Sequence, residues 1–304
     1  MTDRIATFYR TAGLVGKAMD LQSSYARTQQ QTSSGLKSEN FVGIALDSGR
    51  MLDFQSEAAK ANGQVAALKS AQARVESIQN VTSNIGGLLD TINNQLTAAL
   101  DGSRTAAGAV VLGNQATTWK NEIAGLLNTK YAGNYLFGGN VQDSPPVDLT
   151  DPAYTPTLAP TTPDTDYYQG DSVVQTVRVS SGLVLSYGVT ADSAAFEKIF
   201  RALSLVEANP GNLATLNNAF TLIKNASEGV ADISSILASK NDLLNKEMDS
   251  QAATVELLNS AVSDLRDVDI AEASIRLTSI ETQLQASYST LTTLLKLNLV
   301  DYLR

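Results

Sequence analysis

The side chains available for chemistry are mostly carboxylates, because the 304-residue chain contains neither cysteine nor histidine. Without cysteine there can be no disulfide, thiolate nucleophile or zinc–cysteine site. Without histidine the chain lacks the commonest general base and metal ligand, which excludes ordinary Ser-His-Asp and Cys-His catalysis. An enzyme that relies on carboxylates or lysines remains open, beside a protein that performs no chemistry.

Three carboxylates, Asp267, Asp269 and Glu272, lie close together near the C-terminal end. They could hold a metal ion or transfer protons. However, Asp269 followed three residues later by Glu272 has the spacing of a helix N-terminal capping box. Carboxylates at that position also interact favourably with the positive end of the helix dipole. No further type of ligand is grouped nearby, so the sequence favours the structural role.

A second acidic group, Asp164, Asp166 and Asp171, offers oxygen ligands of the kind that Ca²⁺ prefers. It lacks the spacing and the closing glutamate of an EF-hand, which favours a solvated acidic loop. The glycines at 133, 138 and 139 form neither GxxxxGK[ST] nor GxGxxG before a helix, so they predict no phosphate loop. The sequence therefore predicts no catalytic, cofactor-binding or metal-binding residues, and no enzyme.

Composition narrows the class of protein further. The net charge of −9 argues against sequence-independent binding to nucleic acid, which needs a basic surface. With 43% apolar and 17% charged residues, wholesale disorder is not expected. The sequence contains no run of eighteen apolar residues, which would predict membrane insertion. The N-terminus lacks the apolar core of a cleaved secretory signal. We expect a protein that stays in the cytoplasm or leaves without a cleavable signal.

Proline placement predicts where long helices can form. Six of the seven prolines lie between Pro145 and Pro163, and the seventh is Pro210, so 1–144 and 211–304 are free of proline. The predicted fold is mainly α: a long antiparallel bundle or coiled coil from both chain ends, with a small β-rich acidic insert. Helices are predicted over 3–31, 47–101, 103–129, 193–208, 212–264 and 267–304, a short strand around 135–137, and a hairpin over 171–188.

The predicted domains follow from this division. The two chain ends, 1–33 and 268–304, form a terminal coiled-coil polymerisation domain. The stretches 34–140 and 191–267 form a helical bundle domain. Residues 141–190 form the surface insert, and 141–177 contain six aspartates with no lysine or arginine.

Both chain ends carry apolar residues at alternating steps of three and four, as in the a and d positions of a coiled coil. At the gap in the C-terminal stripe, Tyr288 is expected to cover Ser287. The general interpretation is a core within one bundle, but two helices alone bury little surface. Stacked identical copies would cover the remainder. The predicted polymerisation seam comprises Ile5, Phe8, Ala12, Val15, Met19, Ile270, Leu277, Ile280, Leu284, Leu291 and Leu294.

Several segments resemble bacterial flagellins and their hook-associated relatives. Ser33-Ser34-Gly35-Leu36-Lys37 resembles their SSG-type segment, and the stretch 265–272, with Asp267 and Asp269, resembles the opening of their C-terminal helix. Within this superfamily, 133–139 is similar to the G-R-Y-[IL]-F-[AS]-G segment of the hook–filament junction family, hook-associated protein 3. Tyr135, Phe137 and Gly139 match it, whereas Asn134 replaces the usual Arg and Gly138 replaces Ala or Ser. Tyr168-Gln169-Gly170-Asp171 before a valine-rich hairpin is also similar to that family.

The resemblance implies an extracellular structural component of the flagellum, at the hook–filament junction, on which the flagellin filament assembles. It implies export through the type III channel without a cleaved signal, and no cofactor. The implied partners are further copies in a ring-like layer, the first hook-associated protein, flagellin, the export machinery and a cytoplasmic export chaperone.

Three alternatives remain at this point. The nearest is a flagellin-type filament subunit, which copy number would distinguish from an adaptor. An extracellular binding module or carboxylate enzyme on the insert would need a cleft, for which Tyr154, Tyr167 and Tyr168 are candidates. A membrane-active amphipathic helix is disfavoured, because Lys296 and Arg304 do not make a broad basic face.

Overall fold

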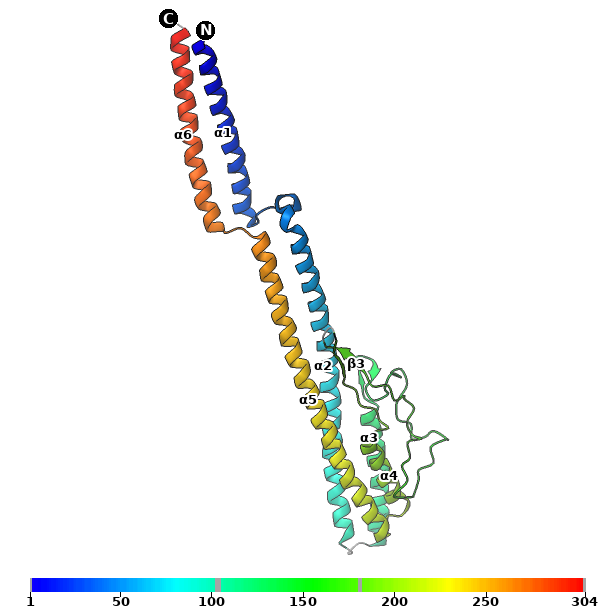
Figure 1. Ribbon diagram of the computed structural model, residues 1–304. Coiled ribbons are helices and arrows are strands. Elements are labelled where there is room, and N and C mark those ends of the chain that lie inside the picture. The colour runs from blue at the N-terminus through cyan, green and yellow to red at the C-terminus, as the bar shows by residue number, and fades with distance from the viewer. Residues whose placement is uncertain (1, 102–104, 180–181, 303–304) are drawn as a thin grey trace. The chain divides into compact units, whose positions relative to one another are not determined.

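The computed structural model describes residues 2–101, 105–179 and 182–302, and these are predominantly helical (Figure 1). The mainly α fold class is confirmed, with helices drawn from both chain ends and small hairpins in the middle. In chain order the elements are α1 (Thr2–Ser34), η1 (Phe41–Ile44), α2 (Ala45–Leu100), α3 (Ala106–Leu127), β1 (Lys130–Tyr131), β2 (Asn134–Tyr135), β3 (Thr176–Arg178), β4 (Val184–Ser186), α4 (Ala194–Ala208), α5 (Leu213–Arg266) and α6 (Ile270–Tyr302).

Contacts divide the chain into two compact units. The terminal unit comprises 1–60 and 253–304, and the central unit comprises 61–252. The terminal unit thus contains α1, α6 and the adjoining ends of α2 and α5. The predicted domains, with boundaries at 33 and 268, divide the chain by role rather than by contact and stay a prediction.

The inner face of α2 supplies much of the core of the central unit. Its seven-residue rhythm places one row of large apolar side chains where water does not reach: Leu68, Val75, Ile78, Ile85, Leu89, Ile92 and Leu96. Thr82 lies in the same row, and its hydroxyl donates to the Ile78 carbonyl oxygen at 2.8 Å, which satisfies the one polar group. Gln72 of α2 donates to the Asn245 side chain of α5 at 2.8 Å.

Helix α4 is buried on nearly every side, which explains how the insert is held. Phe137 meets Phe196 of α4 edge-on, with 6.0 Å between ring centroids. The buried Arg201 and Glu197 side chains pair at 3.0 Å, and Glu197 also accepts a hydrogen bond from the backbone of Asp164 in the insert. A buried charge is tolerated when it is paired in this way. The acidic loop is therefore anchored to the bundle by a carboxylate from a helix.

The strands are shorter than the sequence predicts. β1 and β2 pair around a two-residue turn, Ala132 and Gly133, with φ of 50° and 88°. Phe137 lies beyond the end of β2, and its side chain packs in the core. β3 pairs antiparallel with β4 as the predicted hairpin. Otherwise the described part of the insert has only an isolated bridge, Val147 with Tyr168, so it is irregular rather than β-rich.

The central unit has a convenient probe, because Trp119 is the only tryptophan and lies in its core. Ile85→Ala should lower the unfolding free energy of this unit by about 2–5 kcal/mol, since a fully buried side chain leaves a cavity. Urea unfolding followed by Trp119 fluorescence measures the change.

The matched control is Ile236→Ala, the same substitution at a side chain that is 53% exposed. It should alter the unfolding free energy by less than about 0.5 kcal/mol. Equal effects of the two substitutions would contradict the assigned core.

Candidate assembly interface

Helices α1 and α6 pack against each other along their lengths (Figure 1). On α6, Ala273, Ile280 and Leu284 are buried, and Leu277, Leu291 and Leu294 are half-buried. The predicted C-terminal stripe is therefore largely the face that contacts α1. Ile270 is an exception because its side chain is exposed. The expectation for Tyr288 is wrong: it is 49% exposed, and the small Ser287 lies in the packed face.

The predicted N-terminal stripe does not face α6. Ala12 is exposed, Val15 is 40% exposed and Met19 is 65% exposed, whereas Ala18 and Thr28 are buried. The packed face of α1 comprises Leu14, Ala18, Leu21, Tyr25 and Thr28.

The two stripes of α1 lie one residue apart, which is about 100° around a helix. The packed stripe wins because Leu21 and Tyr25 offer more apolar surface than Gln22 and Ala26, which continue the predicted one. The side chains of Ile5 and Phe8 lie outside the described residues.

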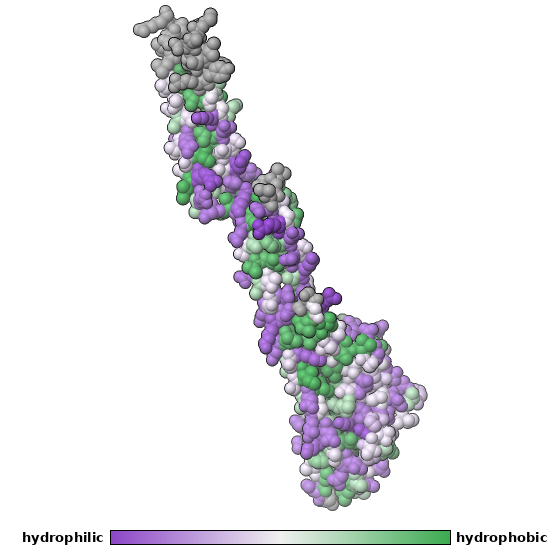
Figure 2. Space-filling view, viewed as in Figure 1, coloured by the Kyte–Doolittle hydropathy of each residue, from purple (hydrophilic) through white to green (hydrophobic). Residues whose placement is uncertain are grey.

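The pair consequently leaves apolar side chains in contact with water. Besides Val15 and Met19 on α1, α6 exposes Ile270, Tyr288 and Ile275, which is 72% exposed. Figure 2 shows apolar surface along this part of the chain. Scattered exposed apolar residues are normal. Here they lie on a two-helix element with little core of its own, so further burial is available only through contacts from outside the pair.

Where α1 and α6 meet the rest of the terminal unit, the segment that follows α1 pairs with the junction between α5 and α6. We call this arrangement the crosspiece: residues 34–40, together with residues 263–269, which comprise the last turn of α5 and the three-residue connection to α6. The Lys37 amide donates to the Arg266 carbonyl oxygen at 2.7 Å, and the Val268 amide donates to that of Gly35 at 2.9 Å. These bonds form an antiparallel bridge between Leu36 and Asp267. Gly35 has a φ of 72°, the left-handed conformation that glycine adopts at helix ends.

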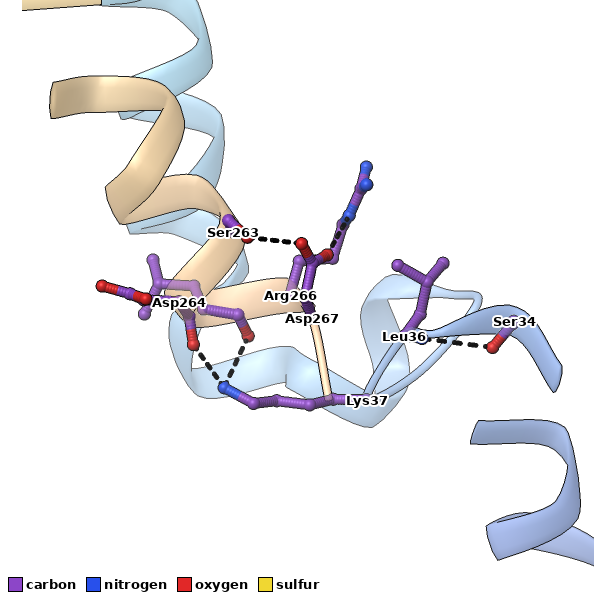
Figure 3. A network of polar contacts seen from close by, with 8 residues as sticks. Ser34, Leu36, Lys37, Ser263, Asp264, Arg266 and Asp267 are labelled. Atoms are coloured by element: carbon purple, nitrogen blue, oxygen red, sulfur yellow. Dashed lines mark hydrogen bonds and ion pairs between the residues drawn. The ribbon is translucent and has the colours of Figure 1, made fainter. Parts of the chain in front are cut away.

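Side chains reinforce the crosspiece (Figure 3). The Lys37 ammonium donates to the carbonyl oxygens of Asp264 and Leu265, the latter at 3.3 Å. The Asp267 carboxylate accepts from the hydroxyl of Ser263 and, at 3.2 Å, from Nε of Arg266. The Ser263 hydrogen bond, followed by the contact with Arg266, lowers the pKa of Asp267. Asp267 therefore serves the crosspiece and not the start of α6.

Asp269 begins α6 as predicted. Its carboxylate accepts from the amides of Ala271 at 2.8 Å and Glu272 at 3.1 Å, which is N-terminal capping. Glu272 pairs with Arg276 at 2.8 Å, so its carboxylate is used one turn further along the helix. Among the residues that the structure describes, no group of three acidic side chains is placed to hold a metal ion.

Two segments that resemble the junction family are in contact, although some thirty residues separate them in the sequence. The Asp171 carboxylate accepts from the amides of Asn140 at 2.7 Å and Val173 at 3.1 Å. The Asp171 amide donates to the Gly138 carbonyl oxygen at 3.3 Å, and the Tyr168 hydroxyl donates to that of Asp171 at 2.6 Å. The Val141 amide also donates to the Gly138 carbonyl oxygen, at 3.2 Å. Together these bonds fasten residues 168–173 of the insert to the turn 138–141 that follows β2; we call the arrangement the clasp.

The clasp explains both glycines of the motif. A Cβ on Gly138 would lie 2.2 Å from the carbonyl oxygen of Val141. A Cβ on Gly139 would lie 2.2 Å from the Asp171 carboxylate, and Gly139 has a φ of 68°. The departure from the family pattern at Gly138 therefore reflects a backbone approach that leaves no room for a side chain.

The tyrosines proposed for a ligand cleft make other contacts. Tyr154 and Tyr167 pack in the core with ring centroids 5.8 Å apart, and Tyr167 donates to the Ala191 carbonyl oxygen at 2.9 Å. Burial raises the pKa of Tyr154 to about 12 and that of Tyr167 further. Asp164 accepts amides of its own loop, from Thr157 and Asp166, at 3.1 Å each. These side chains therefore stabilise the insert.

Sequence reasoning missed two sets of functional residues. One is the packed stripe of α1, whose only signal in the sequence is that Leu21 and Tyr25 are larger apolar residues than Gln22 and Ala26 in the second half of the helix. The other is Lys37, which belongs to the SSG-type segment but has its partners more than two hundred residues away. No local pattern signals such a partner.

The C-terminal part of the chain is similar to a known protein family. Residues 220–303 match the model of the bacterial flagellin C-terminal helical region. The match includes most of α5, one half of the crosspiece and all of α6.

Several solved structures share the fold of this chain. A putative flagellar hook-associated protein from Vibrio parahaemolyticus is 14% identical, with a TM-score of 0.63 over 74% of this chain and 100% of that one. Flagellar hook associated protein-3 from Legionella pneumophila is 13% identical, with a TM-score of 0.56 over 74% of this chain and 99% of that one. FlgL from Bacillus cereus is 16% identical, with a TM-score of 0.52 over 72% of this chain and 99% of that one. At these identities the likeness concerns the fold.

No curated protein matches the chain significantly. Within the described ranges, none of the helices is both long enough and apolar enough to cross a membrane.

The clasp predicts a steric requirement at position 138. Gly138→Ala should destabilise the central unit by about 1–3 kcal/mol, because the new methyl group overlaps the Val141 carbonyl oxygen. Urea unfolding followed by Trp119 fluorescence measures the loss. Gly182→Ala is the control, since nothing lies within 4 Å of a Cβ there. An unchanged midpoint for Gly138→Ala would refute the clasp.

The buried tyrosines predict sensitivity to alkali. In the unfolded chain tyrosine ionises near pH 10, whereas in the folded chain burial keeps Tyr154 neutral up to about pH 12. The folded pKa is the higher one, so this stabilisation is complete below pH 10 and is lost as the pH rises through 12. We expect near-ultraviolet circular dichroism to disappear in this range, together with delayed appearance of tyrosinate absorbance.

Tyr154→Phe removes one of these ionisations and should weaken the pH dependence. If instead all the tyrosines titrate near pH 10 while the dichroism persists, the assigned burial is wrong.

Proposed function

We propose that this protein is a structural component of the bacterial flagellum, an adaptor at the hook–filament junction on which the flagellin filament assembles. It acts by assembly and not by catalysis. One observation carries the proposal. The region that matches the flagellin C-terminal helices includes α6, and the pair that α6 makes with α1 leaves Val15, Met19 and Ile275 exposed to water.

Assembly then follows from hydrophobic burial. Fully burying a large apolar side chain contributes on the order of 1.5–3 kcal/mol. Several side chains per copy, each still partly exposed in the isolated pair, supply a driving force that grows with every neighbour. Identical copies stacked with a constant rotation would cover each other's exposed stripes. The predicted terminal coiled-coil polymerisation domain, 1–33 with 268–304, thereby forms the inner layer of a tube.

The remaining parts receive roles in the same proposal. The helical stretches 34–140 and 191–267 form the wall around that layer. The insert, 141–190, lies on the outside, which suits a loop whose aspartates are mostly exposed or half-exposed. The clasp and the buried Glu197 keep this loop attached to its helices.

The names of the similar structures support the adaptor over the filament subunit. Those with the Vibrio parahaemolyticus and Legionella pneumophila chains are named as hook-associated proteins. The proposed partners are further copies in a ring-like layer, the first hook-associated protein, flagellin, the type III export machinery and an export chaperone. Export through that channel, without a cleaved signal, delivers the chain to the outside of the cell.

The second candidate, a flagellin-type filament subunit, is favoured by the match to the flagellin C-terminal model, which both kinds of protein can give. Copy number separates the two: about a dozen copies at the junction for an adaptor, and thousands along a filament for flagellin. Bacteria that lack this chain should make hooks and shed flagellin into the medium if it is the adaptor.

Met19→Asp tests the assembly face. The charge would have to be buried when copies stack, so the variant should be exported yet absent from isolated flagella, as immunoblotting of both fractions would show. Leu284→Asp should have the same outcome and should in addition weaken the α1–α6 pair. In both variants the central unit keeps its unfolding midpoint.

Ser24→Asp is the matched control, because it places the same charge on an exposed residue of α1 away from the stripe of Met19. This variant should be incorporated. Normal filaments with Met19→Asp would show that the exposed stripe of α1 does not form the assembly interface.

A further inference from the structure

The packed interface between α1 and α6 does little to define the register of the two helices. Small or polar residues occupy several of its packed positions, among them Ala18 and Thr28 on α1 and Ala273 and Ser287 on α6. In a heptad pattern a slip of one heptad returns equivalent positions to the seam, at a displacement of about 10 Å. A seam with few large interlocking side chains discriminates weakly between such registers.

The crosspiece holds the two helices at one level. Its backbone bridge joins Gly35 and Lys37 to Arg266 and Val268. Backbone amides and carbonyls are alike at every residue, so a similar bridge could form after a slip. The bridge stabilises a register without selecting one.

The Lys37 side chain, by contrast, has a unique target. Its ammonium reaches the carbonyl oxygens of Asp264 and Leu265, in the last turn of α5 (Figure 3). Carbonyls of a last helical turn lack partners within the helix and carry the negative end of its dipole. A cation with three donors on a long stem matches such a group of acceptors. Among the described residues these contacts link the N-terminal half of the crosspiece to a helix end.

We propose that Lys37 is the positioning residue that sets the register of α1 against α6. The consequence for assembly rests on the function proposed above. A slip of one heptad would move Val15 and Met19 by about 10 Å relative to Ile275, so the combined apolar surface would no longer fit a neighbouring copy. Lys37 thereby determines which composite surface the pair presents.

Cysteine cross-linking tests the register directly, because the chain has no cysteine of its own. Counting along antiparallel helices from the Leu36–Asp267 bridge places Ala18 near Leu284. The native reporter is therefore Ala18→Cys with Leu284→Cys. The shifted reporters combine Ala18→Cys with Leu277→Cys or with Leu291→Cys, one heptad away in either direction.

Each reporter is oxidised in the purified full-length protein and in isolated flagella, and cross-linked chains are separated on non-reducing gels. With Lys37 present, the native reporter should cross-link and the shifted ones should not. Lys37→Met keeps the length of the side chain and removes its charge. It should lower the ratio of native to shifted product by about five-fold or more. Lys37→Arg should largely restore the ratio.

Lys17→Met is the matched control, since it removes the charge of another exposed lysine, one that lies on α1 and outside the crosspiece. It should leave the ratio unchanged. The same ratio in Lys37→Met and in the parent would overturn the proposal. So would a native reporter that fails to cross-link even with Lys37 in place.

This outcome is separable from a failure of the proposed function. The ratio in the purified protein needs no flagellum, whereas incorporation of Met19→Asp tests assembly without reference to register. If Lys37→Met changes the ratio yet is incorporated normally, the register is real and its role in assembly is refuted.

Discussion

The structure depends on how much apolar surface each pair of helices can cover. In the central unit, α2 and α5 are joined by α3, α4 and the insert, and together they bury a continuous core. In the terminal unit the described parts of α1 and α6 pack against each other. Two helices cover one stripe each, and a pair of that size is marginal in water. The two units therefore differ in how their apolar side chains are covered. The central unit completes its core within the chain, whereas the terminal unit leaves apolar side chains exposed for contacts from outside the pair.

The crosspiece shows how a weakly specified pair can still be well defined. Ser33-Ser34-Gly35 ends α1, and Asp269 starts α6, so both helices are interrupted at the same level. Gly35 takes the left-handed conformation, which lets the chain turn and pair with the segment before α6. Lys37 and Asp267 then add charged groups to the end of α5. The short motifs shared with flagellin-like chains are thus explained by helix termination and bridging, not by catalysis.

The insert is also held by contacts within the chain, made by different types of residue. Its aspartates accept backbone amides, its tyrosines fill the space beside α4, and two adjacent glycines allow the backbone to approach Asp171 and Val141. The aspartates and tyrosines, which in an enzyme could line a cleft, here form contacts within the insert and with the core. A long segment with very few strands is held in place because its polar groups are satisfied locally and its aromatic rings are buried.

By itself, the sequence determined the features that depend on near neighbours along the chain. Proline placement and heptad periodicity located the long helices within a few residues, the three–four spacing identified most of the packed face of α6, and Asp269 was recognised as its cap. Tertiary structure alone decided which of two stripes on α1 is packed, because they differ by one residue and the choice depends on the partner. It also decided the contact between 138–140 and Asp171, the burial of Tyr154 and Tyr167, and the reach of Lys37 to the end of α5. Each of these is a contact between residues far apart in the chain, and local periodicity carries no information about which distant segment will supply the partner.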